Sequence, residues 1–146
     1  MDVDVSESSV RAARDVRTVV GRLRRRLKQT YDTEGLTPSQ TSVLSRLDKF
    51  GPRSTSDLAA AERVRHQSMA ATLQVLDERG LIERHADPSD GRRQLVSVSE
   101  SGHAFLEDKR RAGEEWLARA LEDRYTEPER QALLTALALL ERLTEE

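Results

Sequence analysis

Hydrophobic residues recur at intervals of three and four along most of the chain, which is the spacing of an amphipathic helix. The first stripe predicts a helix and consists of Val16, Val20, Leu23, Leu27 and Tyr31. The basic residues at 22–28 fall mostly off this stripe. A run of this kind is typical of a solvated helix face.

Capping signals mark where further helices begin and end. Thr-Pro-Ser-Gln at 37–40 combines an N-cap hydroxyl, a first-turn proline and a capping-box glutamine, and Phe-Gly-Pro at 50–52 ends the helix that follows. Ser-Thr-Ser-Asp at 54–57 starts a short third helix. After a break around 63–65, a fourth helical pattern begins near His66.

The hydrophobic period changes after the fourth helix. Residues 81–85 and 94–98 are short, strand-like runs, and the turn formers Asp-Pro-Ser-Asp-Gly lie between them at 87–91. We therefore expect a β-hairpin with a long polar tip. A long helical pattern then opens at 99–101, and a second capping box starts a last helix after Thr126.

The order of these elements favours one fold class. A helix, a helix pair with a tight turn, a hairpin and long flanking helices predict a mainly α protein with a small β-hairpin wing, which is a winged helix-turn-helix with long helices at both ends. The chain has 146 residues, enough for one core.

Composition excludes several classes of function. The chain has no Cys, so disulfides, Cys-based zinc sites, thiol nucleophiles and cysteine redox sensing are all excluded. The acidic start at 1–9 lacks the pattern of a secretion signal, and no apolar run approaches the roughly 18 residues of a membrane span. We expect a cytoplasmic protein with no membrane contact.

The charge distribution is more informative than the total. A formal net charge of -2 taken alone argues against a dedicated nucleic-acid binder. The basic residues, however, outnumber the acidic ones in the first third, and the acidic excess lies in the last third. Short arginine runs at 63–65 and 92–93 are compatible with a local basic face in the middle third of the chain.

The fourth helix is the candidate reader of DNA, because the major groove admits one helix. Its N-terminal end and the turn that follows carry the residues that we expect at the major groove: Arg65, His66, Gln67, Ser68, Ala71 and Thr72. The alternative is that these are ordinary exposed residues.

The hairpin tip is a second candidate contact. An arginine at the end of a ribbon can enter a narrow, strongly negative minor groove, and Arg92 is placed for this role. Asp90 is expected to hold the Arg92 guanidinium through a charge-assisted hydrogen bond, and Arg93 to contact phosphate. Alternatively, Asp90 only forms the turn and both arginines are solvated.

Two segments resemble the MarR family of bacterial transcription regulators. Residues 87–93 with 96–102 resemble the family's wing, an Asp-x-Arg tip followed by an aliphatic strand, a hydroxyl cap and a glycine three residues later. Residues 76–84 similarly match the end of the family's recognition helix and the entry to the wing. Arg65 stands where Ser or Thr is more usual.

The resemblance implies a homodimer in which the first helix and the last two pack around a two-fold axis. The Leu-rich last helix agrees, since it has more Leu than one buried face requires; the alternative is intrachain core. The residues expected at the interface are Val16, Val20, Leu133, Leu137 and Leu140. The expected division is a flexible N-terminus at 1–8 and one domain at 9–146, with a winged helix-turn-helix at 35–98 and dimerisation helices at 9–34 and 99–146.

Many members of this family release DNA when a small, often aromatic and anionic compound binds. The candidate lining of such a pocket is Leu27, Tyr31, Leu44, Leu106 and Arg110, although the apolar members also suit a core. Glu100, His103 and Glu107 share a helical face, which is more typical of solvated ion-pair partners than of a metal site. No metal or cofactor is expected.

The sequence therefore predicts a dimeric, sequence-specific DNA-binding regulator, a repressor, that occupies a pseudo-palindromic operator and is released by a small-molecule effector. The alternative from another class is a winged-helix module for protein contact. An enzyme is not expected, since the chain has no phosphate loop, metal triad or Ser-His-Asp arrangement in a recognisable context.

Overall fold

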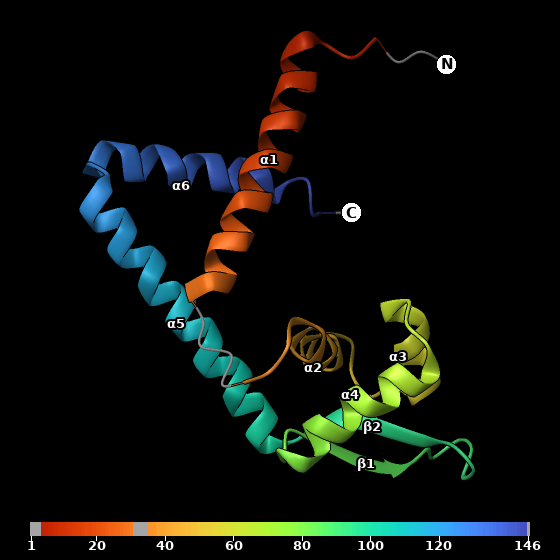
Figure 1. Cartoon of the computed structure of the whole chain (residues 1–146). Helices are drawn as coiled ribbons and strands as arrows, with labels where there is room; N and C mark the ends of the chain where they lie inside the picture. The colour runs from red at the N-terminus through yellow and green to blue at the C-terminus, as the bar shows by residue number, and fades with distance from the viewer. Residues whose placement is uncertain (1–3, 31–34, 146) are drawn as a thin grey trace. The chain divides into compact units, whose positions relative to one another are not determined.

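The structure of the chain is a computed structural model that describes residues 4–30 and 35–145. These residues form six helices and one two-stranded sheet (Figure 1). In chain order the elements are α1 (Glu7–Thr30), α2 (Pro38–Phe50), α3 (Thr55–Glu62), α4 (His66–Glu78), β1 (Ile82–Ala86), β2 (Gln94–Val98), α5 (Glu100–Arg124) and α6 (Glu127–Glu141). The predicted mainly α fold with a β-hairpin is confirmed.

The chain divides into two compact units. Residues 31–110 form one of them, the reader unit, which holds α2, α3, α4 and the hairpin. Residues 1–30 and 111–146 form the other, the helical unit, which holds α1, α6 and the C-terminal part of α5.

The two predicted capping boxes are present. The Thr37 backbone N–H donates to Gln40 Oε1 over 2.9 Å, and the Gln40 backbone N–H donates back to the Thr37 hydroxyl. Thr126 and Glu129 repeat the arrangement at the start of α6. These boxes satisfy backbone donors that the first turn of a helix leaves without an intrahelical partner.

Helix α1 begins at Glu7, well before the start of the apolar stripe at Val16. Its first turn is held by Ser6, whose hydroxyl accepts from the Ser9 backbone N–H over 3.2 Å. An N-cap contact thus starts this helix, and hydrophobic periodicity alone does not locate the first turn.

The core of the reader unit is aliphatic. Its fully buried side chains come from α2, α3, α4 and β2 and are Val43, Leu44, Leu58, Met69, Leu73, Leu76 and Val96. Phe105 and Leu106 of α5 pack against this cluster. Because α4 buries its inner face here, its outer face is held in one orientation.

The wing is an antiparallel pair in which Ile82 lies opposite Val98 and Ala86 opposite Gln94. Arg53 adds a third segment: its backbone N–H donates to Val96 O over 3.1 Å, and the Val96 N–H donates to Arg53 O over 2.8 Å. This bridge was not predicted from the sequence. It fixes the wing to the turn before α3.

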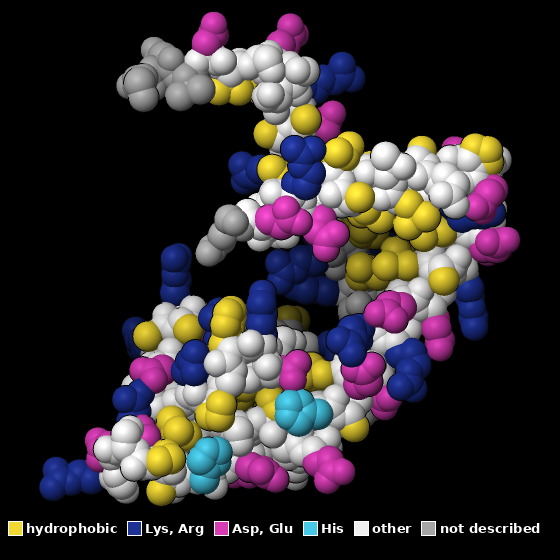
Figure 2. All heavy atoms as spheres, turned by 180° about the vertical axis from the view of Figure 1, so that it is seen from behind, with side chains coloured by type: hydrophobic (Ala, Val, Ile, Leu, Met, Phe, Trp, Pro, Cys, Tyr) yellow, Lys and Arg dark blue, Asp and Glu magenta, His cyan; other side chains and the backbone are white. Residues whose placement is uncertain are grey.

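The helical unit buries little of its apolar surface. Helices α1 and α6 contain no buried residue among those described. Of the residues predicted at a dimer interface, Val16 and Leu140 are half-buried, while the others are exposed at 53% for Val20, 36% for Leu133 and 50% for Leu137. Figure 2 shows hydrophobic side chains gathered on the surface of this unit.

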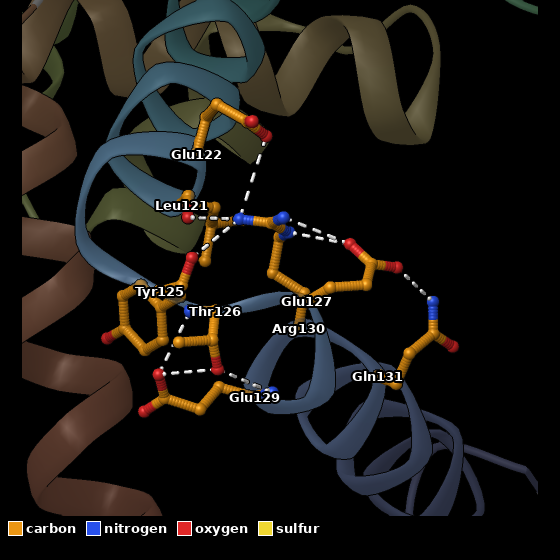
Figure 3. Close-up of polar contacts among 8 residues, drawn as sticks. All are labelled: Leu121, Glu122, Tyr125, Thr126, Glu127, Glu129, Arg130 and Gln131. Carbon is orange, nitrogen blue, oxygen red and sulfur yellow. Dashed lines mark hydrogen bonds and ion pairs between the residues drawn. The ribbon is translucent and has the colours of Figure 1, made fainter.

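Arg130 holds the corner between α5 and α6 (Figure 3). Its Nη1 donates to the carbonyl oxygens of Leu121 and Tyr125 over 3.2 and 2.6 Å, and its guanidinium also pairs with Glu122 and Glu127. Leu121 lies in the last turn of α5 and Tyr125 directly follows the helix; the Leu121 carbonyl oxygen also accepts from the Tyr125 backbone N–H over 3.2 Å. Arg130 therefore caps one helix from the first turn of the next.

No helix in the described part of the chain is both long and apolar enough to cross a membrane.

Candidate nucleic-acid interface

Helices α3 and α4 form the predicted helix-turn-helix. They are joined by residues 63–65, in which Arg63 takes the left-handed conformation at φ 55°. The Arg63 and Val64 backbone N–H groups donate to carbonyl oxygens of the last turns of α3. These bonds close α3 and set the angle at which α4 begins.

The N-terminus of α4 has no side-chain cap. Arg65 is the N-cap residue, with extended backbone, and makes no side-chain cap hydrogen bond. Free N–H groups at a helix start favour an anionic partner such as phosphate. Because position 65 holds Arg and not the more usual Ser or Thr, no side chain caps the backbone N–H groups at this end of α4.

The outer face of α4 presents the predicted reader residues. Arg65, His66, Gln67, Ser68 and Ala71 are exposed, and Thr72 is half-buried. The Thr72 hydroxyl donates to Ser68 O over 3.1 Å, so its lone pairs are left to accept from a ligand. The structure therefore places all six residues at the N-cap and along the N-terminal half of one helix.

The hairpin tip is built by two aspartates. The Asp87 carboxylate accepts from the backbone N–H and the hydroxyl of Ser89, and these bonds, the backbone one above all, lower the pKa of Asp87. The Asp90 carboxylate accepts from the Arg92 backbone N–H over 3.1 Å. The predicted contact of Asp90 with the Arg92 guanidinium is therefore corrected: Asp90 holds the main chain, as turn-forming aspartates do.

Arg92 and Arg93 have different surroundings. Within residues 4–30 and 35–145, no carboxylate pairs with the side chain of Arg92 or of Arg65. The Arg93 guanidinium, by contrast, pairs with the Asp57 carboxylate and donates to the Ser54 hydroxyl over 2.8 Å. Arg93 was predicted to contact phosphate, and in the free chain it is bound to α3 and its N-cap.

A hollow of about 430 Å³ lies where α3, α4 and the wing meet. Its lining is polar and consists of Ser54, Thr55, Ser56, Asp57, His66, Arg93 and Gln94. Sequence reasoning treated Ser54 and Asp57 only as cap residues of α3. Their position beside the wing had no local signal, since Arg93 is 36 residues from Asp57.

The residues predicted for an effector pocket are only partly brought together. Leu106 and Arg110 line one hollow of about 420 Å³ in the reader unit. Leu44 is fully buried in the core and is not available to a ligand, which corrects that prediction. Leu27 is half-buried in the helical unit, and Tyr31 lies outside the described residues.

The face of α5 that carries Glu100, His103 and Glu107 does not form a metal cluster. His103 Nδ1 lies 2.9 Å from Asp48 Oδ1, and Glu107 pairs with Arg110. In the described part of the chain no three His, Asp or Glu side chains are grouped to hold a metal.

Comparison with known proteins gives a family. The MarR family model matches residues 34–93, the part of the chain that holds the helix-turn-helix and the wing tip. An HTH-type transcriptional regulator of Mycobacterium tuberculosis is 38% identical over 140 residues, which cover 96% of this chain and 97% of the relative. The chain belongs to the MarR family. It is therefore a DNA-binding transcriptional regulator and not an enzyme.

Solved structures support the same assignment. A Pseudomonas aeruginosa protein assigned as a transcriptional regulator is 38% identical, with a TM-score of 0.76 over 97% of this chain and 99% of that one. A Staphylococcus aureus MepR variant bound to an oligodeoxyribonucleotide is 19% identical and shares the fold, with a TM-score of 0.67 over 92% of this MarR-family chain and 98% of that one.

Proposed function

We propose that this chain is a dimeric repressor that occupies a pseudo-palindromic operator through α4 and the wing. The observation that carries the proposal is the start of α4, where an uncapped helix end and exposed polar side chains share one surface with Arg65. Such a surface supplies both base-edge hydrogen bonds and an anion site. The MepR variant of the same fold is bound to DNA.

Each group has a proposed role. Arg65, Gln67, Ser68 and Thr72 contact base edges of the major groove, with His66 and Ala71 on the same surface. Arg92, which has no carboxylate partner in the described ranges, enters the minor groove. Asp90 serves by shaping the turn that presents Arg92.

A second copy of the chain covers the helical unit in this proposal. The support is the absence of a buried residue in the described parts of α1 and α6, together with exposed leucines along α6. Apolar surface of this extent is typical of a permanent interface. A symmetric dimer presents two α4 helices to half-sites about 10 base pairs apart.

Release by a small aromatic anion is the proposed control. The support is the hollow of about 420 Å³ lined by Ser45, Asp48, His103, Leu106, Glu107 and Arg110. Leu106 offers an apolar contact, and Arg110 a cation within the same hollow. A ligand here would compete with the Glu107 carboxylate for Arg110.

The test is selection of duplexes from a randomised library by the purified full chain. We expect enrichment of a sequence with two-fold symmetry, and an affinity whose logarithm falls linearly with the logarithm of salt concentration. Failure to enrich any sequence at low salt would instead favour the winged-helix module for protein contact.

A further inference from the structure

The wing is tied to α3 and to the turn before it by side chains as well as by the main chain. Arg93, at the end of the hairpin turn, pairs with the Asp57 carboxylate and donates to the Ser54 hydroxyl over 2.8 Å. Ser54 is itself buried and caps α3, accepting from the Asp57 backbone N–H over 3.1 Å. One guanidinium therefore joins the wing to the first turn of a core helix.

The same arginine also closes the hairpin tip. Its carbonyl oxygen accepts from the Asp87 backbone N–H over 2.8 Å, and its backbone N–H donates to Asp90 O over 3.0 Å. The main chain of Arg93 thus belongs to the turn that presents Arg92, while its side chain is held by α3. A displacement of the guanidinium would be passed directly to the position of that turn.

Asp57 lies on a surface that faces DNA in the proposed function. Its carboxylate is half-exposed and lines the hollow between α3, α4 and the wing. An unpaired carboxylate there would repel phosphate. The ion pair with Arg93 neutralises that charge, so the acid can remain at the interface.

We propose that Asp57 and Arg93 form a latch that positions the wing tip for DNA, and that Arg93 acts through this contact and not as a phosphate ligand. The latch rests on the proposed function, because it positions Arg92 for the groove assigned there. Asp57 and Arg93 are positioning residues in this scheme, and Ser54 is the buried anchor that both share.

The test compares Asp57→Asn, Arg93→Ala and the double variant with the wild type. The probe is the duplex that the wild-type chain enriches most strongly, with a scrambled duplex of the same length as the non-specific reference. We expect each single variant to bind the probe roughly fivefold to tenfold more weakly, and the double variant to bind no more weakly than the worse single, since coupled residues are not additive. Thermal melts of the variants check that the fold is retained.

The sign of the Asp57→Asn effect separates positioning from charge. If the Asp57 carboxylate acts only by repelling phosphate, its removal strengthens DNA binding. If the carboxylate positions the wing tip through Arg93, its removal weakens DNA binding. Glu83→Gln is the matched control, because Glu83 is exposed on β1 and its side chain has no hydrogen bond or ion pair with another described residue. We expect this control to leave binding to the probe unchanged or slightly tighter.

The salt dependence separates the latch from a phosphate contact. A lost phosphate contact reduces the slope of log affinity against log salt by about 0.9. We expect the double variant, in which Arg93→Ala is combined with Asp57→Asn and no unpaired carboxylate is left, to weaken binding without changing this slope. A slope reduced by that amount would overturn the latch and make Arg93 a phosphate ligand, and so would tight binding by Asp57→Asn or additive effects in the double variant.

Failure of the latch and failure of the proposed function give different results. If the wild type enriches no sequence, the proposed function fails, and the role of the latch on DNA fails with it. If the wild type enriches a site and Asp57→Asn binds it as tightly, only the latch fails. Amide exchange of Asp87 in the free chain adds a readout without DNA, and we expect Asp57→Asn to speed this exchange several-fold; unchanged exchange would count against the latch.

Discussion

Gly102 lies directly against the backbone of Leu81. A Cβ at position 102 would stand 2.1 Å from the Leu81 carbonyl oxygen and 2.7 Å from a methyl carbon of Val98. Gly102 also donates its N–H to the Ser99 hydroxyl, which in turn donates to Gly80 O. The start of α5 is thereby packed on the entry to the wing.

We expect Gly102→Ala to lower the free energy of unfolding by at least about 1–3 kcal/mol, because the backbone must shift to admit the methyl group. Urea unfolding measures the change. Gly91→Ala is the control, since a Cβ there meets no atom within 4 Å, and its stability should stay close to that of the wild type. Equal stability of the two variants would contradict the close packing of Gly102.

Arg92→Ala should weaken binding of the enriched duplex. The side chain has no carboxylate partner among the described residues, so its removal costs the fold little and costs the complex a groove contact. We expect a loss of roughly tenfold to a hundredfold, measured by fluorescence anisotropy at matched salt. Sedimentation should show an intact dimer. Unchanged affinity would remove the wing tip from the mechanism.

Leu137→Asp should separate the proposed dimer. Leu137 is 50% exposed in the single chain, and a symmetric interface would bury it twice. Loss of two buried leucines raises the dimer dissociation constant by about a hundredfold or more. Analytical ultracentrifugation measures this shift. Phe50→Asp, which replaces an exposed apolar side chain of the reader unit, should leave the association state as it was.

Arg130→Ala should destabilise the corner between α5 and α6. The variant leaves the Leu121 and Tyr125 carbonyl oxygens without their side-chain donor. Hydrogen bonds from a charged donor contribute about 1.5–3 kcal/mol each at most, so we expect a clear fall in thermal midpoint. Arg130→Lys keeps the charge and loses the fork geometry, so its thermal midpoint should lie between those of the wild type and Arg130→Ala. If Lys matches Arg, charge alone holds the corner.

Glu129 makes the start of α6 sensitive to acid. The backbone N–H of Thr126, and after it the Thr126 hydroxyl, hold the pKa of Glu129 below its ordinary value of 4.5. A pKa lowered by folding means that the contribution to stability is present above pH 4.5 and is lost as the pH falls through the lowered pKa. We expect Glu129→Gln to lose less stability than the wild type over this range. Thermal melts at stepped pH measure the difference. Parallel curves of thermal midpoint against pH for the wild type and Glu129→Gln would contradict the prediction.

Local signals in the sequence predicted most of the fold. Capping boxes at Thr37 and Thr126 and the change of period after α4 act over a few residues, so a single chain displays them. The exposed side chains at the N-terminal end of α4 could be located for the same reason, because the start of a helix fixes which side chains project from its first turns; their role in reading DNA stays a prediction.

Contacts between distant segments had no such signal. The Arg53 bridge to Val96 and the Arg93 pair with Asp57 join residues about 40 positions apart, and no local pattern marks either one. Leu44 was assigned to a pocket because an apolar helix position suits a core and a ligand equally, and only packing decides between them.

The reciprocal bridge between Arg53 and Val96 has a consequence for the form of the operator. If α4 and the wing enter two grooves as proposed, the hairpin bonded to the turn before α3 requires these grooves to lie at a single separation along the duplex. An added base pair inside a half-site would then break recognition outright. Tolerance for spacing can reside only in the distance between half-sites, which the pairing of two copies decides.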